Sequence, residues 1–150
     1  MSEGARDTGD QVEMLGLRTP EENTATLSPP GQDEHRLTVL VIDDEAALLA
    51  IISEVLEESG YRVLAVPDGP SGLDIIRSDR PIDLLLTDIR LPKGMNGRQV
   101  AEAALCIRPR LKVLFMTGYA GSVLDDSAEV MIKPFDLNRL ADRVRRRIEG

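Results

Sequence analysis

The sequence predicts an α/β fold, a doubly wound five-stranded parallel sheet. From Leu37 onward, short apolar runs alternate with segments whose apolar residues recur at helical spacing, and Pro and Gly mark the joints. Strands that alternate with helices in this way form a parallel sheet covered on both faces. A chain of 150 residues, 42% of them hydrophobic and 29% charged, is also typical of one soluble globular domain.

The first elements follow from these patterns in order. Residues 37–42 are a continuous β-prone run, suited to a strand that is buried on both faces. A helix is expected over residues 45–59, because apolar residues recur at helical spacing and Gly60 follows where a helix would stop. A strand over 61–66, a short helix over 71–78 and a strand over 82–87 come next.

The second half repeats the alternation. Asn96 and Gln99 resemble a capping box that opens a third helix. Strands are expected over 111–116 and 129–132, and Asp136 is the expected cap of the last helix. The apolar face of the third helix is predicted to be Val100, Ala103, Ala104 and Ile107, and that of the last helix Leu137, Leu140, Ala141, Val144 and Ile148.

Residues 1–36 differ in composition from the rest. They contain eight acidic residues against three arginines, so about −5 of the formal charge of −8 lies there. No period of two or 3.6 is sustained, which predicts a disordered tail before a folded domain over 37–150. His35, the one histidine of the chain, is expected to be a solvated residue of this tail.

Composition excludes several classes of function. The acidic balance argues against a nucleic-acid binder with a broad basic surface. Four arginines near the end of the last helix (143, 145, 146 and 147) are expected to complement the helix dipole and extend into water, since no aromatic residues interleave with them. The single cysteine, Cys106, excludes an internal disulfide and is expected to be a small buried helix residue. Without a membrane-spanning run or a signal peptide, we expect a cytoplasmic protein.

Polar residues stand at the ends of four predicted strands. Asp43 and Asp44 follow the first strand, Asp88 the third, Thr117 the fourth and Lys133 the fifth. Parallel sheets bind ligands outside the carboxyl ends of their strands, so these side chains are expected to meet at one rim. Each aspartate alone would be interpreted as a helix cap or turn residue, but together they predict a site.

This combination of residues suits phosphoryl chemistry. Three carboxylates in one crevice repel one another unless a cation neutralises them, and Mg²⁺ prefers a few carboxylates plus water and phosphate oxygens. A carboxylate beside that ion can attack phosphorus and form an acyl phosphate. The transferred group spreads negative charge over three oxygens, which the ammonium of Lys133 and the hydroxyl of Thr117 would stabilise.

Four segments resemble the receiver domains of response regulators, over residues 37–149. They are V-L-V-I-D-D-E at 39–45, L-L-L-T-D-I-R-L-P at 84–92, L-F-M-T-G-Y at 114–119 and I-K-P-F at 132–135. The resemblance implies a flavodoxin-like sheet with strand order 2-1-3-4-5.

The resemblance also implies roles for single residues. Asp88 corresponds to the phosphoacceptor, Asp43 and Asp44 to the acidic pair that binds Mg²⁺, and Arg90 to the residue whose backbone carbonyl contacts the metal. Thr117 and Lys133 correspond to the hydroxyl and the lysine that stabilise the phosphoryl group. The Lys133–Pro134 peptide bond is commonly cis in this family, which would fix the direction of the lysine.

Two features depart from the family's pattern. Val130 stands three residues before the lysine, where receivers often have an aromatic switch residue. Tyr119 is a candidate for that switching role or for gating water, and equally for a rim residue with no such role. Only 15 residues separate Thr117 from Lys133, which predicts a shortened fourth helix and an altered partner-binding surface.

The first functional hypothesis is therefore a signalling switch rather than an enzyme. A histidine kinase or histidine phosphotransfer protein would donate a phosphoryl group to Asp88 with the help of Mg²⁺. With no output domain after Gly150, the chain is expected to be a stand-alone receiver or one excised from a hybrid kinase. The alternatives are an aspartate-based phosphohydrolase, whose Asp-x-Asp spacing the pair Asp43–Asp44 lacks, and a phosphate-independent scaffold.

Overall fold

The computed structural model describes residues 36–118 and 129–150. Residues 1–35 of the predicted tail, which include His35, lie outside the described residues, as do Tyr119 and the predicted short fourth helix. None of the described helices is both long enough and apolar enough to cross a membrane.

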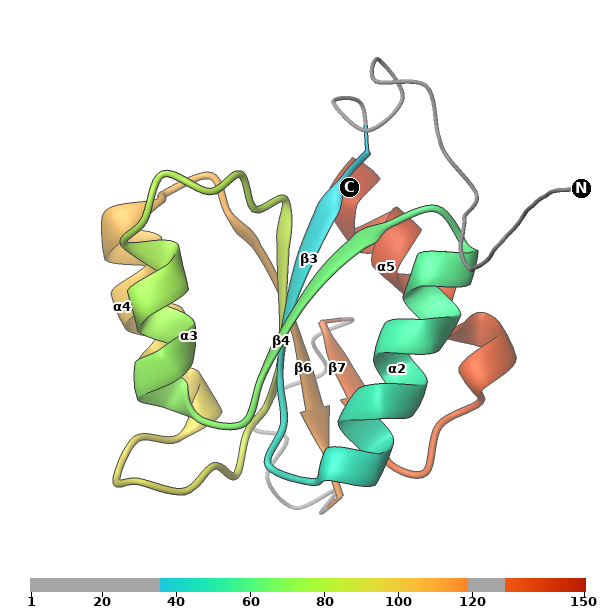
Figure 1. Cartoon of the computed structure of the whole chain (residues 1–150), viewed down its shortest axis with the longest axis horizontal. Coiled ribbons are helices and arrows are strands. Elements are labelled where there is room, and N and C mark those ends of the chain that lie inside the picture. The colour runs from blue at the N-terminus through green and yellow to red at the C-terminus, as the bar shows by residue number, and fades with distance from the viewer. Residues whose placement is uncertain (1–35, 119–128) are drawn as a thin grey trace, which may run out of the picture. The chain divides into compact units, whose positions relative to one another are not determined.

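A five-stranded parallel sheet forms the centre of the domain (Figure 1). The strands lie side by side in the order β4-β3-β5-β6-β7, which is 2-1-3-4-5 in chain order. All four strand pairings are parallel, which confirms the predicted fold. The strands are β3 (Thr38–Ile42), β4 (Arg62–Val66), β5 (Leu84–Asp88), β6 (Lys112–Thr117) and β7 (Val130–Ile132).

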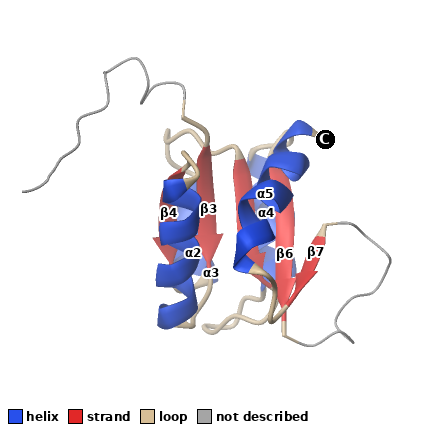
Figure 2. Ribbon diagram, turned by 90° about the vertical axis from the view of Figure 1, so that its right-hand side faces the viewer, coloured by secondary structure: helices blue, strands red, loops and turns tan. Residues whose placement is uncertain are grey.

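Helices cover both faces of the sheet (Figure 2). Helices α2 (Ala46–Glu58) and α5 (Leu140–Glu149) lie on one face, and α3 (Gly69–Ile76) and α4 (Gly97–Ile107) lie on the other. A short 3-10 turn, η2 (Leu137–Arg139), leads into α5. Alternation along β3 explains the two layers: Val39 and Val41 pack with α2 and α5, whereas Leu40 and Ile42 pack with α3 and α4.

Most predicted boundaries agree with the structure to within one residue. The helix expected over 71–78 is displaced, because the side chain of Asp68 accepts a hydrogen bond from the Ser71 amide and the helix begins at Gly69. The strand expected over 82–87 begins at Leu84 and includes Asp88 as its last residue.

The expected inner face of α4 is partly wrong. Val100 and Ala104 are buried, but Ala101 is buried beside them and Ile107 is 42% exposed. The inner stripe therefore runs through positions 97, 100, 101 and 104 and leaves the end of the helix in solvent. Cys106 lies on that outer side and is exposed, which corrects the prediction that it is buried.

Candidate functional site

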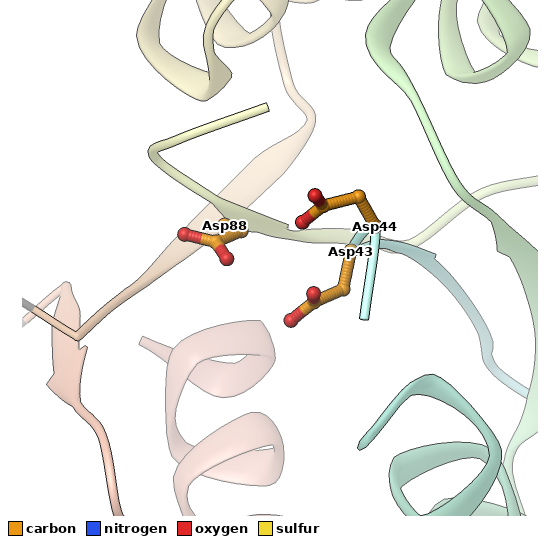
Figure 3. Close-up of side chains that lie close together, drawn as sticks. All are labelled: Asp43, Asp44 and Asp88. Carbon is orange, nitrogen blue, oxygen red and sulfur yellow. The ribbon is translucent and has the colours of Figure 1, made fainter. Parts of the chain in front are cut away.

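The carboxyl ends of β3 and β5 bring three aspartates together (Figure 3). Asp43 directly follows β3, Asp44 follows it, and Asp88 ends β5, the neighbour of β3 in the sheet. One carboxylate oxygen from each of the three lies within 4.8 Å of the other two. The prediction from the strand ends is confirmed in this respect: residues 45 positions apart form one acidic cluster.

Backbone groups fix the first of these aspartates. The Asp43 amide donates to the Val66 carbonyl at 3.2 Å, and Asp43 Oδ1 accepts from the Glu45 amide at 2.9 Å. The Asp43 side chain is fully buried, whereas Asp44 is exposed. The cluster is therefore rigid on the side of the sheet and open to solvent on the side of Asp44.

Lys133 bridges the two buried carboxylates. It directly follows β7, and its Nζ lies 2.9 Å from Asp43 Oδ2 and 2.8 Å from Asp88 Oδ2. Burial lowers the pKa of Lys133, but the hydrogen bonds and negative charges of Asp88 and Asp43 outweigh burial and raise that pKa above its usual value. The ammonium is therefore charged at neutral pH.

The loop after β5 holds Asp88 in place. Asp88 Oδ1 accepts from the Arg90 amide at 3.1 Å, so both of its carboxylate oxygens have a donor. The Ile89 amide donates to the Met116 carbonyl at 2.9 Å, and the Gly97 amide donates to the Ile89 carbonyl at 2.7 Å. These bonds tie the end of β5 to β6 and to the start of α4.

The start of α4 approaches the backbone of Asp88 closely. A Cβ added at Gly97 would lie 2.0 Å from the Asp88 carbonyl oxygen and 3.0 Å from the Ile89 Cα. Only glycine fits this contact, because the obstructing atoms are backbone and cannot rotate away. Gly97 therefore helps to hold the end of β5, and with it Asp88, in place.

The remaining residues expected at the rim lie at the ends of β6 and β7 and in the loop after β5, except for Tyr119. Thr117 is buried at the end of β6, and its carbonyl accepts from the Lys133 amide at 2.7 Å. The Lys133–Pro134 peptide bond is cis. Val130 begins β7 opposite Phe115 of β6. The metal-binding role of the Arg90 carbonyl stays a prediction, and Tyr119 lies outside the described residues.

The donor set of the cluster fits a magnesium ion. Three carboxylates outnumber the single ammonium of Lys133, so the cluster keeps a negative charge that a divalent cation would balance. Mg²⁺ retains several waters and takes only one or two carboxylates plus phosphate oxygens, which suits a cluster that is exposed on the side of Asp44.

One ion pair near the rim was not predicted. Lys93, with a positive φ of 66°, lies in the loop after β5, and its Nζ is 3.2 Å from Asp68 Oδ2 at the start of α3. This pair joins the loop that follows Asp88 to the start of α3. No spacing in the sequence signals it, because the two residues are 25 positions apart in loops of irregular shape.

Comparison with known proteins identifies the family. A family model of the response regulator receiver domain matches residues 39–145. The chain belongs to this family. Receiver domains are the signalling switches of two-component systems, so the five strand-end residues described above belong to a receiver.

Two curated relatives have a similar length to the receiver. The response regulator receiver protein CpdR of Brucella abortus is 35% identical over 112 residues, which covers 71% of this chain and 92% of CpdR. The sporulation initiation phosphotransferase F of Bacillus subtilis is 30% identical over 114 residues, which covers 72% of this chain and 90% of the relative.

Solved structures share the fold. A response regulator receiver protein from Sinorhizobium medicae superposes with a TM-score of 0.71 at 30% identity, covering 78% of this chain and 98% of that one.

Proposed function

We propose that this receiver is a phosphoryl-accepting switch and that Asp88 takes the phosphoryl group from a histidine kinase or a histidine phosphotransfer protein. The observation that carries the proposal is the contact of Lys133 Nζ with Asp88 at 2.8 Å and with Asp43 at 2.9 Å, inside a cluster of three carboxylates. The Bacillus subtilis relative is a sporulation initiation phosphotransferase, which supports the same chemistry.

The transfer follows from the groups present. An Asp88 carboxylate oxygen attacks the phosphorus of a phosphohistidine, a new P–O bond forms, and the P–N bond breaks with its electron pair left on the imidazole. The Lys133 ammonium already touches the attacking carboxylate, so it lies next to the oxygens of the incoming group. The Thr117 hydroxyl, at the end of the adjacent strand β6, is the second expected donor to those oxygens.

A magnesium ion is part of the proposal. Asp43, Asp44, Asp88 and the backbone carbonyl of Arg90 would hold it. When bound, Mg²⁺ balances the repulsion between carboxylates and phosphoryl oxygens. Asp43 and Lys133 then keep the cluster in the geometry that lets Asp88 face a phosphoryl donor.

The product of this chemistry is a changed protein rather than a released molecule. We propose that the phosphorylated form acts in the cytosol through contacts with other proteins, and that it turns over slowly. Position 130, at the start of β7, is a valine and not an aromatic switch residue. We therefore expect a different side chain to change position on phosphorylation and to be recognised by the partner.

The direct test is phosphorylation by a small donor. Wild type incubated with acetyl phosphate and Mg²⁺ should gain the mass of one phosphoryl group in an intact-mass spectrum. Asp88→Asn should gain none, and Asp43→Asn should gain it more slowly, because it lacks one metal ligand and one partner of Lys133. Glu45→Gln is the matched control, since Glu45 is an exposed carboxylate next to the pair and outside the cluster.

Two outcomes would favour the alternatives. Fast repeated turnover of phosphate esters that survives Asp88→Asn would support a phosphohydrolase. Partner affinity that is identical with and without beryllofluoride, a phosphoryl mimic, would support a phosphate-independent scaffold.

A further inference from the structure

A second feature of the structure, separate from the aspartate cluster, is a groove lined by arginines. It has a volume of about 770 Å³ and is lined by residues of α5 and of the start of β7, the edge strand of the described sheet. Arg139, Arg143, Arg146 and Arg147 line it together with Glu129, Val130 and Gly150. We call it the arginine groove.

Two of these arginines are anchored to the sheet. Arg147 Nε donates to the Val113 carbonyl at 2.9 Å, and another of its nitrogens lies 2.8 Å from Glu129 Oε1. Arg143 donates to the Val130 carbonyl at 3.3 Å. The prediction that all the arginines of this helix extend into water is therefore wrong for these two. Their guanidinium groups are held at the groove before any ligand arrives, which reduces the entropic cost of binding.

The other two arginines are exposed and weakly paired. The Arg139 side chain is 83% exposed and lies 3.9 Å from Asp136, and the Arg146 side chain is 73% exposed and lies 3.0 Å from Asp142. Surface ion pairs of this kind contribute little to stability. Both guanidiniums can therefore turn to a ligand at small cost.

The charge of the groove is opposite to that of the chain. Of the residues that the structure describes, four arginines and one glutamate line the groove, whereas the whole chain carries a formal charge of −8. An acidic partner is attracted to the groove and repelled by the rest of the protein. Such a distribution orients a partner as well as attracting it.

The arrangement of the arginines favours an extended ligand over a compact one. Residues 143, 146 and 147 lie on one stripe of α5, and residue 139, the last of η2, lies one turn before them. At a rise of about 1.5 Å per residue, this row of arginines is about 12 Å long. Alternate side chains of an extended peptide lie about 7 Å apart on one face, so three carboxylates span a similar length. A single phosphate would meet only one or two of the arginines. Among the described residues, the lining contains no aromatic side chain on which a nucleic-acid base could stack.

We infer that the arginine groove binds an extended acidic segment of a partner protein, with aspartate or glutamate at alternate positions. The carboxylates pair with Arg139, Arg143 and Arg146, and the peptide runs along α5 beside β7. This site does not depend on the chemistry proposed for Asp88, so either can fail without the other.

Fluorescence anisotropy with a labelled peptide tests this inference on the full chain. The probe is an octapeptide of alternating Glu and Thr, and the same peptide with Gln in place of Glu is the uncharged control. Arg146→Gln and Arg145→Gln are matched variants, because each removes one exposed arginine that pairs with Asp142, but only Arg146 lines the groove. Thermal melts establish that both variants fold.

The inference predicts that wild type binds the Glu peptide and not the Gln peptide. Arg139→Gln combined with Arg146→Gln should raise the Kd about tenfold, whereas Arg145→Gln should change it by less than about twofold. An equal loss of affinity for the Glu peptide in Arg145→Gln and Arg146→Gln would overturn the inference, because the attraction would then not depend on the groove. A competition experiment gives a second check, with inorganic diphosphate and the unlabelled Glu peptide as competitors of the labelled peptide. If diphosphate displaces the labelled peptide at a lower concentration than the unlabelled peptide does, the groove is a phosphate site and the inference is overturned.

Discussion

Asp68 shows how one carboxylate controls the structure near the rim. Its Oδ1 accepts from the Ser71 amide at 2.8 Å, and its Oδ2 pairs with Lys93 at 3.2 Å. The hydrogen bond from the Ser71 backbone, then that from the Ser71 side chain, and the proximity of Lys93 lower the pKa of Asp68, although burial opposes them. The charged form therefore stabilises the folded state.

This shift fixes the direction of a pH effect. Because the pKa of Asp68 is lower in the folded than in the unfolded protein, its stabilisation is fully present above the unfolded pKa of about 4 and is lost as the pH falls through the folded value. Urea unfolding at neutral pH should give a lower midpoint for Asp68→Ala than for wild type, and the difference should shrink below about pH 4. Asp68→Asn retains a side chain that can cap α3, so its unfolding midpoint should fall less than that of Asp68→Ala. A difference that grows on acidification would contradict this account.

The sequence predicts which residues of the site are neighbours wherever these residues stand at the ends of strands. Asp43, Asp44, Asp88 and Lys133 were predicted correctly as neighbours, because parallel strands bring their carboxyl ends to one edge. The pair of Asp68 and Lys93 depends on the path of two loops, which periodicity does not describe.

Helix α4 shows how one element supports the site. Its first residue, Gly97, lies against the backbone of Asp88, so the helix can approach β5 only because that position lacks a Cβ. The capping box of Asn96 and Gln99 fixes where the helix begins. The position of α4 and the position of Asp88 are therefore coupled.

Gly97→Ala tests this coupling. The added Cβ would lie 2.0 Å from the Asp88 carbonyl oxygen, so the variant should lower the free energy of unfolding by about 1–3 kcal/mol despite the better helix propensity of alanine. It should also slow phosphorylation by acetyl phosphate, because the end of β5 must move. Gly118→Ala is the control, since a Cβ there meets no atom within 4 Å. Equal unfolding midpoints for the Gly97 and Gly118 variants would refute the coupling.

The elements themselves were predictable, and their details less so. Every described strand and helix was expected from periodicity, because apolar runs and helical stripes follow directly from burial. The exposure of Cys106 and Ile107 was not predicted in this way, because both residues lie beyond Ala104, the last buried residue of α4, where the helical stripe no longer meets the core.

At the scale of the whole molecule, an excess of negative charge lies at the carboxyl ends of the strands. Two apolar layers hold the strands together, while three carboxylates and one ammonium meet where β3, β5 and β7 end. The strand order was predicted correctly because the alternation of strands and helices, together with the resemblance to receivers, allows few other arrangements.

Magnesium should therefore stabilise the folded protein. A ligand that binds only the folded state at 100 times its Kd raises the free energy of unfolding by about 2.7 kcal/mol. Thermal unfolding of wild type should shift upward with Mg²⁺, and Asp44→Asn should lose most of the shift, because Asp44 is the exposed carboxylate of the cluster. Asp74→Asn, at an exposed carboxylate on α3, is the control and should keep the shift. An Mg²⁺ response that Asp44→Asn leaves unchanged would place the ion elsewhere.

The most direct test of the central claim is to locate the phosphoryl group. Borohydride reduces an aspartyl phosphate to homoserine, which peptide mass spectrometry assigns to one position. After treatment with acetyl phosphate and Mg²⁺, we expect homoserine at position 88 and unmodified aspartate at positions 43 and 44. Homoserine at position 43 or 44 with an intact Asp88 would contradict the assignment of Asp88 as the phosphoacceptor.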